Sequence, residues 1–249
     1  MPNKKKIVIF TSDPFGLKIY DFVNSKKEYE TYLVVAKNNL LNDQIKMLNI
    51  NIFEYYENLG KKKNLLKFKK YNFDLLISVY FNRIFKKKIF SSVKKTVNFH
   101  PSYLPHHKGC YPHVHSILSK IGGGISFHEI DQKVDSGQIL YQKKIFPNLL
   151  DNQDSFHEKI KDEFLKEFKK KFKFILSGKL KSKIKYSKGN YNNKYSLKKY
   201  DRLFLNKSYK LKDLILLLNA RKYQSNTFSY FKYKNKKIKI HMKLSKDDK

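Results

Sequence analysis

Short apolar runs alternate with longer amphipathic segments in the N-terminal part of the chain, and this alternation limits the possible folds most strongly. The buried-strand patterns lie at residues 6–10, 31–36, 50–53, 73–80 and 96–100. The helical patterns between them lie at residues 17–23, 42–48 and 59–71. Strands and helices that alternate at this spacing predict an α/β fold with an open, mostly parallel, Rossmann-like sheet that helices cover on both faces.

Three loops of this predicted sheet are expected to meet at one edge. Open α/β sheets bind ligands beyond the carboxyl ends of their strands. Residues 11–16, 80–84 and 98–101 should therefore surround one crevice. The first of these loops, Thr11-Ser12-Asp13-Pro14-Phe15-Gly16, lacks the GxGxxG fingerprint of dinucleotide sites. A Rossmann-like dehydrogenase is therefore disfavoured.

The chain changes character after Pro147. Residues 151–177 predict a long amphipathic helix in which apolar residues from Phe156 to Phe172 recur near every fourth position. Residues 179–198 are polar and are typical of a linker. A helix at 211–220 and a β-hairpin turning near Asn235 are expected to follow. We predict a main domain over residues 1–180 and a small C-terminal accessory or dimerisation module over residues 181–249.

Lysine dominates a formal net charge of +33. A basic surface gains affinity for nucleic acids by releasing phosphate counterions, but arginine is better suited to bidentate phosphate recognition. Only Arg83, Arg202 and Arg221 are arginines. The lysines accompany abundant Asn, Ile, Phe and Tyr, as an AT-rich coding sequence would produce without selection for a ligand. We interpret the charge as a solvated surface with a moderate preference for anionic substrates, and expect no nucleic-acid partner.

The sequence also bears on location. No window approaches the roughly eighteen consecutive apolar residues of a membrane span, and too few apolar residues precede Thr11 for a signal peptide. A single cysteine, Cys110, excludes an internal disulfide and suits a reducing compartment. We expect a cytoplasmic protein without membrane association.

Two polar motifs lie at the end of the last of these strands and after it. In Val97-Asn98-Phe99-His100-Pro101-Ser102-Tyr103-Leu104-Pro105, Asn98 and His100 lie two residues apart near the end of a strand, so both side chains should point to the same side. An alternating strand at residues 124–131 and the segment Val134-Asp135-Ser136-Gly137-Gln138-Ile139 follow. By itself, Asp135 before Ser136-Gly137 is equally typical of an ordinary turn.

The order of these motifs closely resembles the folate-dependent formyltransferase family. That family has Asn-x-His-Pro-Ser-x-Leu-Pro followed by Gly-x-(Ser/Thr)-x-His and Val-Asp-(Thr/Ser)-Gly-x-Ile. The resemblance is strongest over residues 75–145. It implies that Asn98, His100 and Asp135 are catalytic, that residues 1–180 form the catalytic domain, and that N10-formyltetrahydrofolate is the cosubstrate.

The chemistry of formyl transfer suits these three side chains. An amine that attacks a carbonyl creates an oxyanion, which one fixed donor such as the Asn98 amide stabilises by about 3–4 kcal/mol. The attacking nitrogen must lose protons while the folate N10 gains one, and an imidazole, whose ordinary pKa is near neutrality, suits both transfers. His100 is that candidate. The carboxylate of Asp135 would orient that imidazole or hold a relaying water.

The resemblance also implies binding residues. The cofactor-binding candidates are Phe81, Asn82, Ile84, His128 and Asp131. The substrate-binding candidates are Ser78, Tyr80, Arg83, Lys108, Tyr111 and His113, among which Lys108 stands where family members often have arginine. The histidine-rich stretch at residues 106–115 lacks the paired ligand spacing of zinc sites, so no metal is expected.

Three acceptor amines are compatible with the family. Methionyl-tRNA enzymes usually carry a larger C-terminal barrel, and glycinamide ribonucleotide enzymes generally end soon after the catalytic domain. The tail, with its Arg221-Lys222-Tyr223 and an aromatic hairpin, resembles that of nucleotide-sugar N-formyltransferases. We therefore expect a dTDP-linked 3-amino- or 4-amino-dideoxyhexose used for surface polysaccharide, and a homodimer. A lysine-rich RNA-binding module is the non-enzyme alternative.

Overall fold

The computed structural model describes residues 4–37, 41–48, 50, 52–119, 121–180 and 189–245. Its contacts divide the chain into two compact units, each made of three segments. The first unit comprises Met1–His100, Ser126–Gln142 and Glu163–Lys185, and the second comprises Pro101–Ile125, Lys143–Asp162 and Tyr186–Lys249. Parts of the predicted catalytic domain thus belong to the second unit. The functional boundary at residue 180 stays a prediction.

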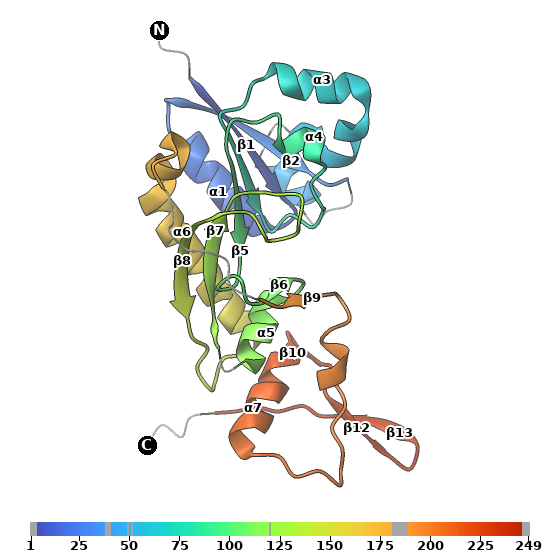
Figure 1. The fold of residues 1–249 in the computed structure, drawn as a ribbon. Helices are drawn as coiled ribbons and strands as arrows, with labels where there is room; N and C mark the ends of the chain where they lie inside the picture. Colours follow the sequence, from blue (N-terminus) through green and yellow to red (C-terminus); the bar gives the residue numbers. More distant parts are fainter. Residues whose placement is uncertain are drawn as a thin grey trace. The chain divides into compact units, whose positions relative to one another are not determined.

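A seven-stranded sheet forms the centre of the fold (Figure 1). Its strands are β1 (Lys5–Thr11), β2 (Tyr29–Val35), β3 (Ile52–Tyr55), β4 (Leu75–Val79), β5 (Thr96–His100), β7 (Gly123–His128) and β8 (Ile139–Ile145). They lie in the order β3-β2-β1-β4-β5-β7-β8. The five strands from β3 to β5 pair in parallel, whereas β5 and β7 are antiparallel. The predicted α/β, mostly parallel sheet is confirmed.

The helices that connect the strands differ slightly from the predicted ones. They are α1 (Pro14–Asn24), α2 (Asn42–Met47), the 3-10 helix η1 (Tyr56–Gly60), α3 (Lys62–Lys70), α4 (Lys87–Phe90) and α6 (Gln153–Ser177). The helix predicted at 59–71 starts at Lys62, because η1 ends at Gly60 and Lys61 is extended with ψ 137°. The very short α4 was not predicted.

Two aromatic layers hold the first unit together. On one face of the sheet, Val8 and Phe10 of β1 pack into a buried cluster with Phe68 of α3. On the other face, the predicted stripe of α6 is buried, and Phe168 and Phe172 both pack against Phe22 of α1, at ring-centroid distances of 5.6 and 5.9 Å. Because burial of each large apolar side chain contributes about 1.5–3 kcal/mol, these layers fix the sheet edge that carries the polar residues.

The second unit holds the remaining short elements. They are β6 (Lys108–Gly109), α5 (Pro112–Leu118), β9 (Tyr191–Asn192), the 3-10 helix η2 (Lys198–Tyr200), α7 (Leu211–Ala220), β10 (Lys222–Tyr223), β11 (Asn226–Thr227), β12 (Tyr230–Tyr233) and β13 (Lys236–Lys239). The predicted C-terminal helix and hairpin are present as α7 and β12–β13. The hairpin turns at Lys234 and Asn235, whose φ values of 44° and 62° suit the type I′ turn that two-residue hairpin loops favour.

Part of the predicted linker over residues 179–198 is outside the described residues, which omit 181–188. Within the described part, β9 pairs in parallel with β6, so this segment is not entirely irregular. Among the described residues, no helix combines the length and the apolar composition needed to cross a membrane.

Candidate active site

The carboxyl ends of β1, β4 and β5 lie side by side in the sheet. Thr11 pairs with Val79 in the strand register, and Val79 pairs with Phe99. The chain runs from β1 through β2 to β3 on one side and then places β4 on the other side of β1, so this edge is a topological switch point, where ligands bind in open α/β sheets. The Ser12 hydroxyl donates to the Asn82 side-chain oxygen at 2.9 Å, which joins the loops after β1 and β4.

The sequence-predicted triplet converges at this edge. Asn98 and His100 project from the same face of β5, because Phe99 between them faces α6 and stacks on Phe164. The Asn98 amide nitrogen lies 3.5 Å from Asp135 Oδ1, and His100 Nδ1 lies 3.3 Å from Asp135 Oδ2. The His100 and Asp135 side chains are only 5% and 10% exposed. Three groups up to 37 positions apart in the sequence therefore meet in a largely water-excluded place.

A tight turn holds Asp135 against the end of β7. Its φ of 48° lies in the left-handed region, which Asp tolerates better than most residues. Two residues later, a Cβ on Gly137 would collide with the carbonyl oxygen of Glu129. The Glu129 amide donates to the Gln138 carbonyl at 2.9 Å. The missing side chain at Gly137 thus permits the close backbone contact that places Asp135 beside the triplet.

His128 is the fourth polar side chain in this cluster. Its Nδ1 lies 2.6 Å from the Glu129 carbonyl oxygen, which can only accept, so Nδ1 carries a hydrogen. With the hydrogen on Nδ1, the Nε2 atom can accept a hydrogen bond, and it lies 3.0 Å from the Asn98 amide nitrogen. His128 therefore accepts one of the two amide hydrogens and orients Asn98. The second amide hydrogen remains for Asp135 or for a developing oxyanion.

The sequence predicted His128 as a folate contact and did not identify this contact with Asn98. In the structure, Asn98 and His128 are direct partners in the antiparallel pairing of β5 and β7. Cross-strand partners in such pairs have adjacent side chains. The pairing itself was not predictable from the motif spacing. A role of His128 in binding folate stays a prediction.

The predicted binding residues of the loop after β4 are held by protein contacts. Phe81 packs edge-on against Tyr56, with ring centroids 5.0 Å apart, and the Ile84 carbonyl accepts from the Tyr56 hydroxyl at 2.6 Å. Asn82 accepts hydrogen bonds from Ser12 and from Arg83. The backbone of this loop is thereby fixed, while the Ile84 side chain is 75% exposed.

Arg83 was predicted as a cation for the substrate. Its Nε lies 3.2 Å from a carboxylate oxygen of Glu57, and a role in binding substrate stays a prediction. Desolvation raises the pKa of the Glu57 carboxyl, but backbone and side-chain hydrogen bonds together with Arg83 bring it below its usual value. Arg83 therefore has a resident counter-ion, which no local sequence pattern predicts because Glu57 is 26 positions away.

The other predicted residues of the first unit occupy different environments. Ser78 lies within β4 and is 1% exposed. The Tyr80 ring packs edge-on against Phe15 at 5.8 Å, and its φ is 47°. Asp131 is exposed, and its carboxylate accepts from the Gln132 amide at 2.6 Å. Binding roles for all three residues stay predictions.

Lys108, Tyr111 and His113 belong to the second unit. Lys108 lies in β6, and Tyr111 is 46% exposed just before α5. The His113 ring stacks on His157 with centroids 4.3 Å apart. Burial, followed by the neighbouring His157, holds the pKa of His113 well below its usual range. In the described ranges, no three His, Cys, Asp or Glu side chains gather as a metal site would require.

Comparisons with known proteins agree with this geometry. A family model described as "Formyl transferase" matches residues 6–168. The dTDP-4-amino-4,6-dideoxyglucose formyltransferase of Mycobacterium tuberculosis H37Rv is 29% identical over 134 residues, which are 54% of this chain and 57% of that protein. Methionyl-tRNA formyltransferase of Prochlorococcus marinus is 32% identical over 108 residues, 42% of this chain and 32% of that enzyme.

Among solved structures, a 4-N formyltransferase from Francisella tularensis is 26% identical with a TM-score of 0.83. That likeness covers 97% of this chain and 98% of the other, whereas the match to the mycobacterial relative spans just over half of that protein. Because the family model matches well over half of the residues, and its motifs converge at one sheet edge, the chain belongs to the formyl transferase family.

Proposed function

We propose that this protein moves the formyl group of N10-formyltetrahydrofolate to the amine of a nucleotide-linked amino-dideoxyhexose. A dTDP-linked 3-amino or 4-amino sugar, used for surface polysaccharide such as O-antigen, is the acceptor that we favour. The observation that carries the proposal is the convergence of Asn98, His100 and Asp135 at the carboxyl edge of the sheet. That arrangement supplies an amide donor, an imidazole and a carboxylate within one buried cluster.

The residues present fit the folate cosubstrate. The fixed backbone of residues 81–84 and the exposed Ile84 side chain offer an apolar edge with main-chain polar groups beside the triplet's strand. Bound N10-formyltetrahydrofolate supplies the formyl group. The Asn98 amide is the donor that this group's carbonyl oxygen requires.

Each member of the cluster then has a separate task. Asn98, oriented by His128, donates to the oxygen that gains negative charge when the amine attacks, an interaction typically contributing about 3–4 kcal/mol. His100 accepts a proton from the attacking amine and can return it to the folate N10, which leaves with the electron pair of the broken C–N10 bond. Asp135, at 3.3 Å, orients the ring and offsets its positive charge. No protein nucleophile is needed because the amine itself attacks.

The choice of an amino-sugar acceptor is supported by how much of the chain each relative matches. The Francisella 4-N formyltransferase matches nearly the whole chain, including the helix and hairpin of the tail. The methionyl-tRNA enzyme shares only about a third of its own length with this chain. We further propose a cytoplasmic homodimer. The tail supports it with exposed apolar side chains, among them Leu205 and Leu211, at 66% and 73% exposure.

The test is a panel of dTDP-, GDP- and UDP-linked amino sugars incubated with N10-formyltetrahydrofolate. We expect a formamide product, detected by mass, from at least one dTDP-linked sugar. Turnover of charged initiator tRNA with no sugar product would replace the acceptor by methionyl-tRNA. Absence of any turnover, with nucleic-acid affinity unchanged by His100→Ala, would instead favour the RNA-binding module.

A further inference from the structure

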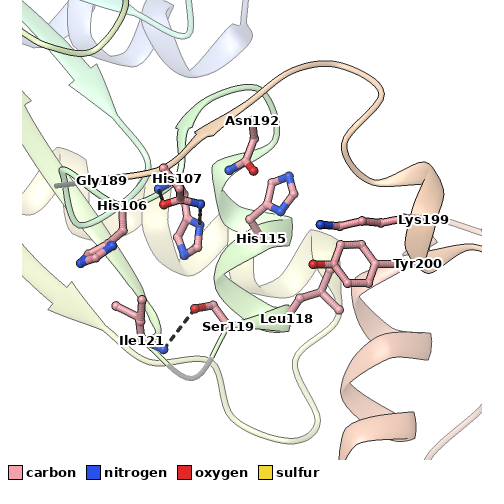
Figure 2. Close-up of a pocket in the computed structure, with 11 residues that line it drawn as sticks. His106, His107, His115, Leu118, Ser119, Ile121, Gly189, Asn192, Lys199 and Tyr200 are labelled. Atoms are coloured by element: carbon pink, nitrogen blue, oxygen red, sulfur yellow. Dashed lines mark hydrogen bonds between the residues drawn. The ribbon is translucent and has the colours of Figure 1, made fainter.

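A separate cavity of about 420 Å³ lies within the second unit. Figure 2 shows side chains from three places converging on it: the loop before β6, the helix α5 and the segment around β9 and η2. Its lining residues are His106, His107, His115, Leu118, Ser119, Ile121, Gly189, Asn190, Asn192, Lys199 and Tyr200. The volume falls within the roughly 300–1,000 Å³ typical of small-ligand sites.

Asn192 gives the cavity a buried donor without a partner. This residue is 9% exposed, and its side-chain Nδ2 is buried with no hydrogen-bond partner. Leaving a buried donor unsatisfied costs about 1–3 kcal/mol. A ligand that brings an acceptor to this nitrogen would remove the cost. Such an atom therefore points to a bound acceptor group.

The described lining of the cavity carries positive charge and no negative charge. Lys199 reaches into the cavity from η2, with its ammonium 5.0 Å from the centroid of the Tyr200 ring. Lys199 forms no ion pair with any described carboxylate, and none of the described lining residues is acidic. In the first unit, by contrast, Arg83 has its counter-ion in Glu57. The cavity thus has a positive charge that no lining residue neutralises.

Besides burial, the positive charge near the cavity contributes to the lowered pKa of His115. Its Nε2 lies 2.9 Å from the Ser196 hydroxyl oxygen, and Ser196 donates its own hydrogen to the Asn193 carbonyl. The Nε2 atom of His115 is therefore the donor. Burial first, then Lys199 and Arg221, lowers the pKa of His115 to about 4. Near neutral pH the ring is uncharged, so Lys199 remains the cation.

The cavity wall is also held in place without a ligand. The Lys108 and Cys110 amides donate to the carbonyls of Asn190 and Asn192, at 3.1 and 2.8 Å. The Asn190 side-chain oxygen accepts from the His107 amide at 2.8 Å. Because these bonds fix the strand that carries Asn192, its free donor is preorganised, and binding need not order it.

We propose that this cavity binds a phosphate-bearing anion, which the Lys199 ammonium and the Asn192 side-chain amide contact directly. Phosphate oxygens accept several hydrogen bonds and carry the charge that the lining lacks, and lysine is a common point-charge partner of phosphate. The cavity is larger than a phosphate ion, so it has room for a nucleotide. Two sources share this chemistry: the diphosphate of a nucleotide-linked substrate and a separate phosphate compound. Only the first rests on the proposed function.

Calorimetric titration of the full chain tests the proposal with dTDP, inorganic diphosphate and inorganic phosphate as probes. Lys199→Gln removes the cation, and Asn192→Asp replaces the free donor by a carboxylate of the same shape. Lys198→Gln is the matched control, because Lys198 is the neighbouring exposed residue of η2 and does not line the cavity. Circular dichroism and thermal melting check that each variant is folded.

We expect Lys199→Gln to weaken phosphate-dependent binding by about tenfold or more, as the loss of a charge-assisted contact implies. Asn192→Asp should weaken it further, and Lys198→Gln should bind as the native chain does. If the variants lose affinity for dTDP alone, the ligand is the diphosphate of the nucleotide carrier. If they lose affinity for diphosphate or phosphate while all variants bind dTDP equally, the ligand is a separate phosphate compound.

Equal affinity of Lys199→Gln and the native chain for every probe would overturn the proposal, even if Asn192→Asp is weakened. Absence of binding by the native chain would overturn it too. These measurements need no turnover. Failure of the cavity to bind phosphate is therefore distinct from failure of the chain to formylate an amino sugar.

Discussion

The polar cluster of the first unit and the cavity of the second unit differ in the partners that their polar side chains have. At the sheet edge, Asn98, His100 and His128 all contact one carboxylate, Asp135. In the cavity, the described lining has no carboxylate, and the Asn192 amide nitrogen is without a partner. A cluster of imidazoles around a carboxylate can take up and pass on protons. A lining with one sign can only attract the opposite charge, so we assign chemistry to the first and binding to the second.

Replacing His100 is the strongest test of the role that this comparison assigns to the first unit. His100→Ala should lower kcat by about 10³–10⁴-fold, because this ring, 3.3 Å from Asp135, is the group to which we assign the proton transfers. Asp135→Asn, which keeps the shape and removes the charge, should have a similar effect. Both variants should still bind tetrahydrofolate in a fluorescence titration. A near-normal rate in either variant would remove that residue from its role.

Asn98→Ala is expected to have the next largest effect, a loss of about 10²–10³-fold in kcat, as for other oxyanion donors. The fold should persist, since Asn98 is only partly buried and its neighbour Phe99 carries the packing. Single-turnover mass spectrometry separates this loss of rate from a loss of binding. If KM rises while kcat is unchanged, Asn98 binds substrate and stabilises no charge.

His128 is a positioning residue for Asn98, and its replacement should cost less. His128→Ala should reduce kcat by about tenfold with KM nearly unchanged, because Asn98 keeps its donor but loses the acceptor that orients it. His128→Gln, whose side-chain oxygen can accept from Asn98, should restore part of the rate. A folate-binding role would instead raise KM in both variants, and the glutamine would give no rescue.

Parts of this picture followed from sequence and others required coordinates. The strand and helix pattern, the α6 stripe and the hairpin at Asn235 were predictable because local periodicity and turn chemistry determine them. The meeting of Asn98, His100 and Asp135 followed from motif order. The Glu57 partner of Arg83 and the cavity at Asn192 were not predictable, because they depend on contacts between residues far apart in the chain. No local pattern records such contacts.

The last effect is on stability and not on rate, and it concerns the pH dependence of unfolding in the second unit. The pKa of His115 is lowered to about 4 in the folded chain, against an ordinary value near 6.5. Between these values the unfolded chain binds the proton and the folded chain does not. The free energy of unfolding should therefore fall as the pH drops from 7 to 5, by up to about 2 kcal/mol. Urea titrations at pH 7 and pH 5 measure the change. His115→Gln should flatten it, and an unaltered slope in that variant would assign the pH dependence to another group, such as His113.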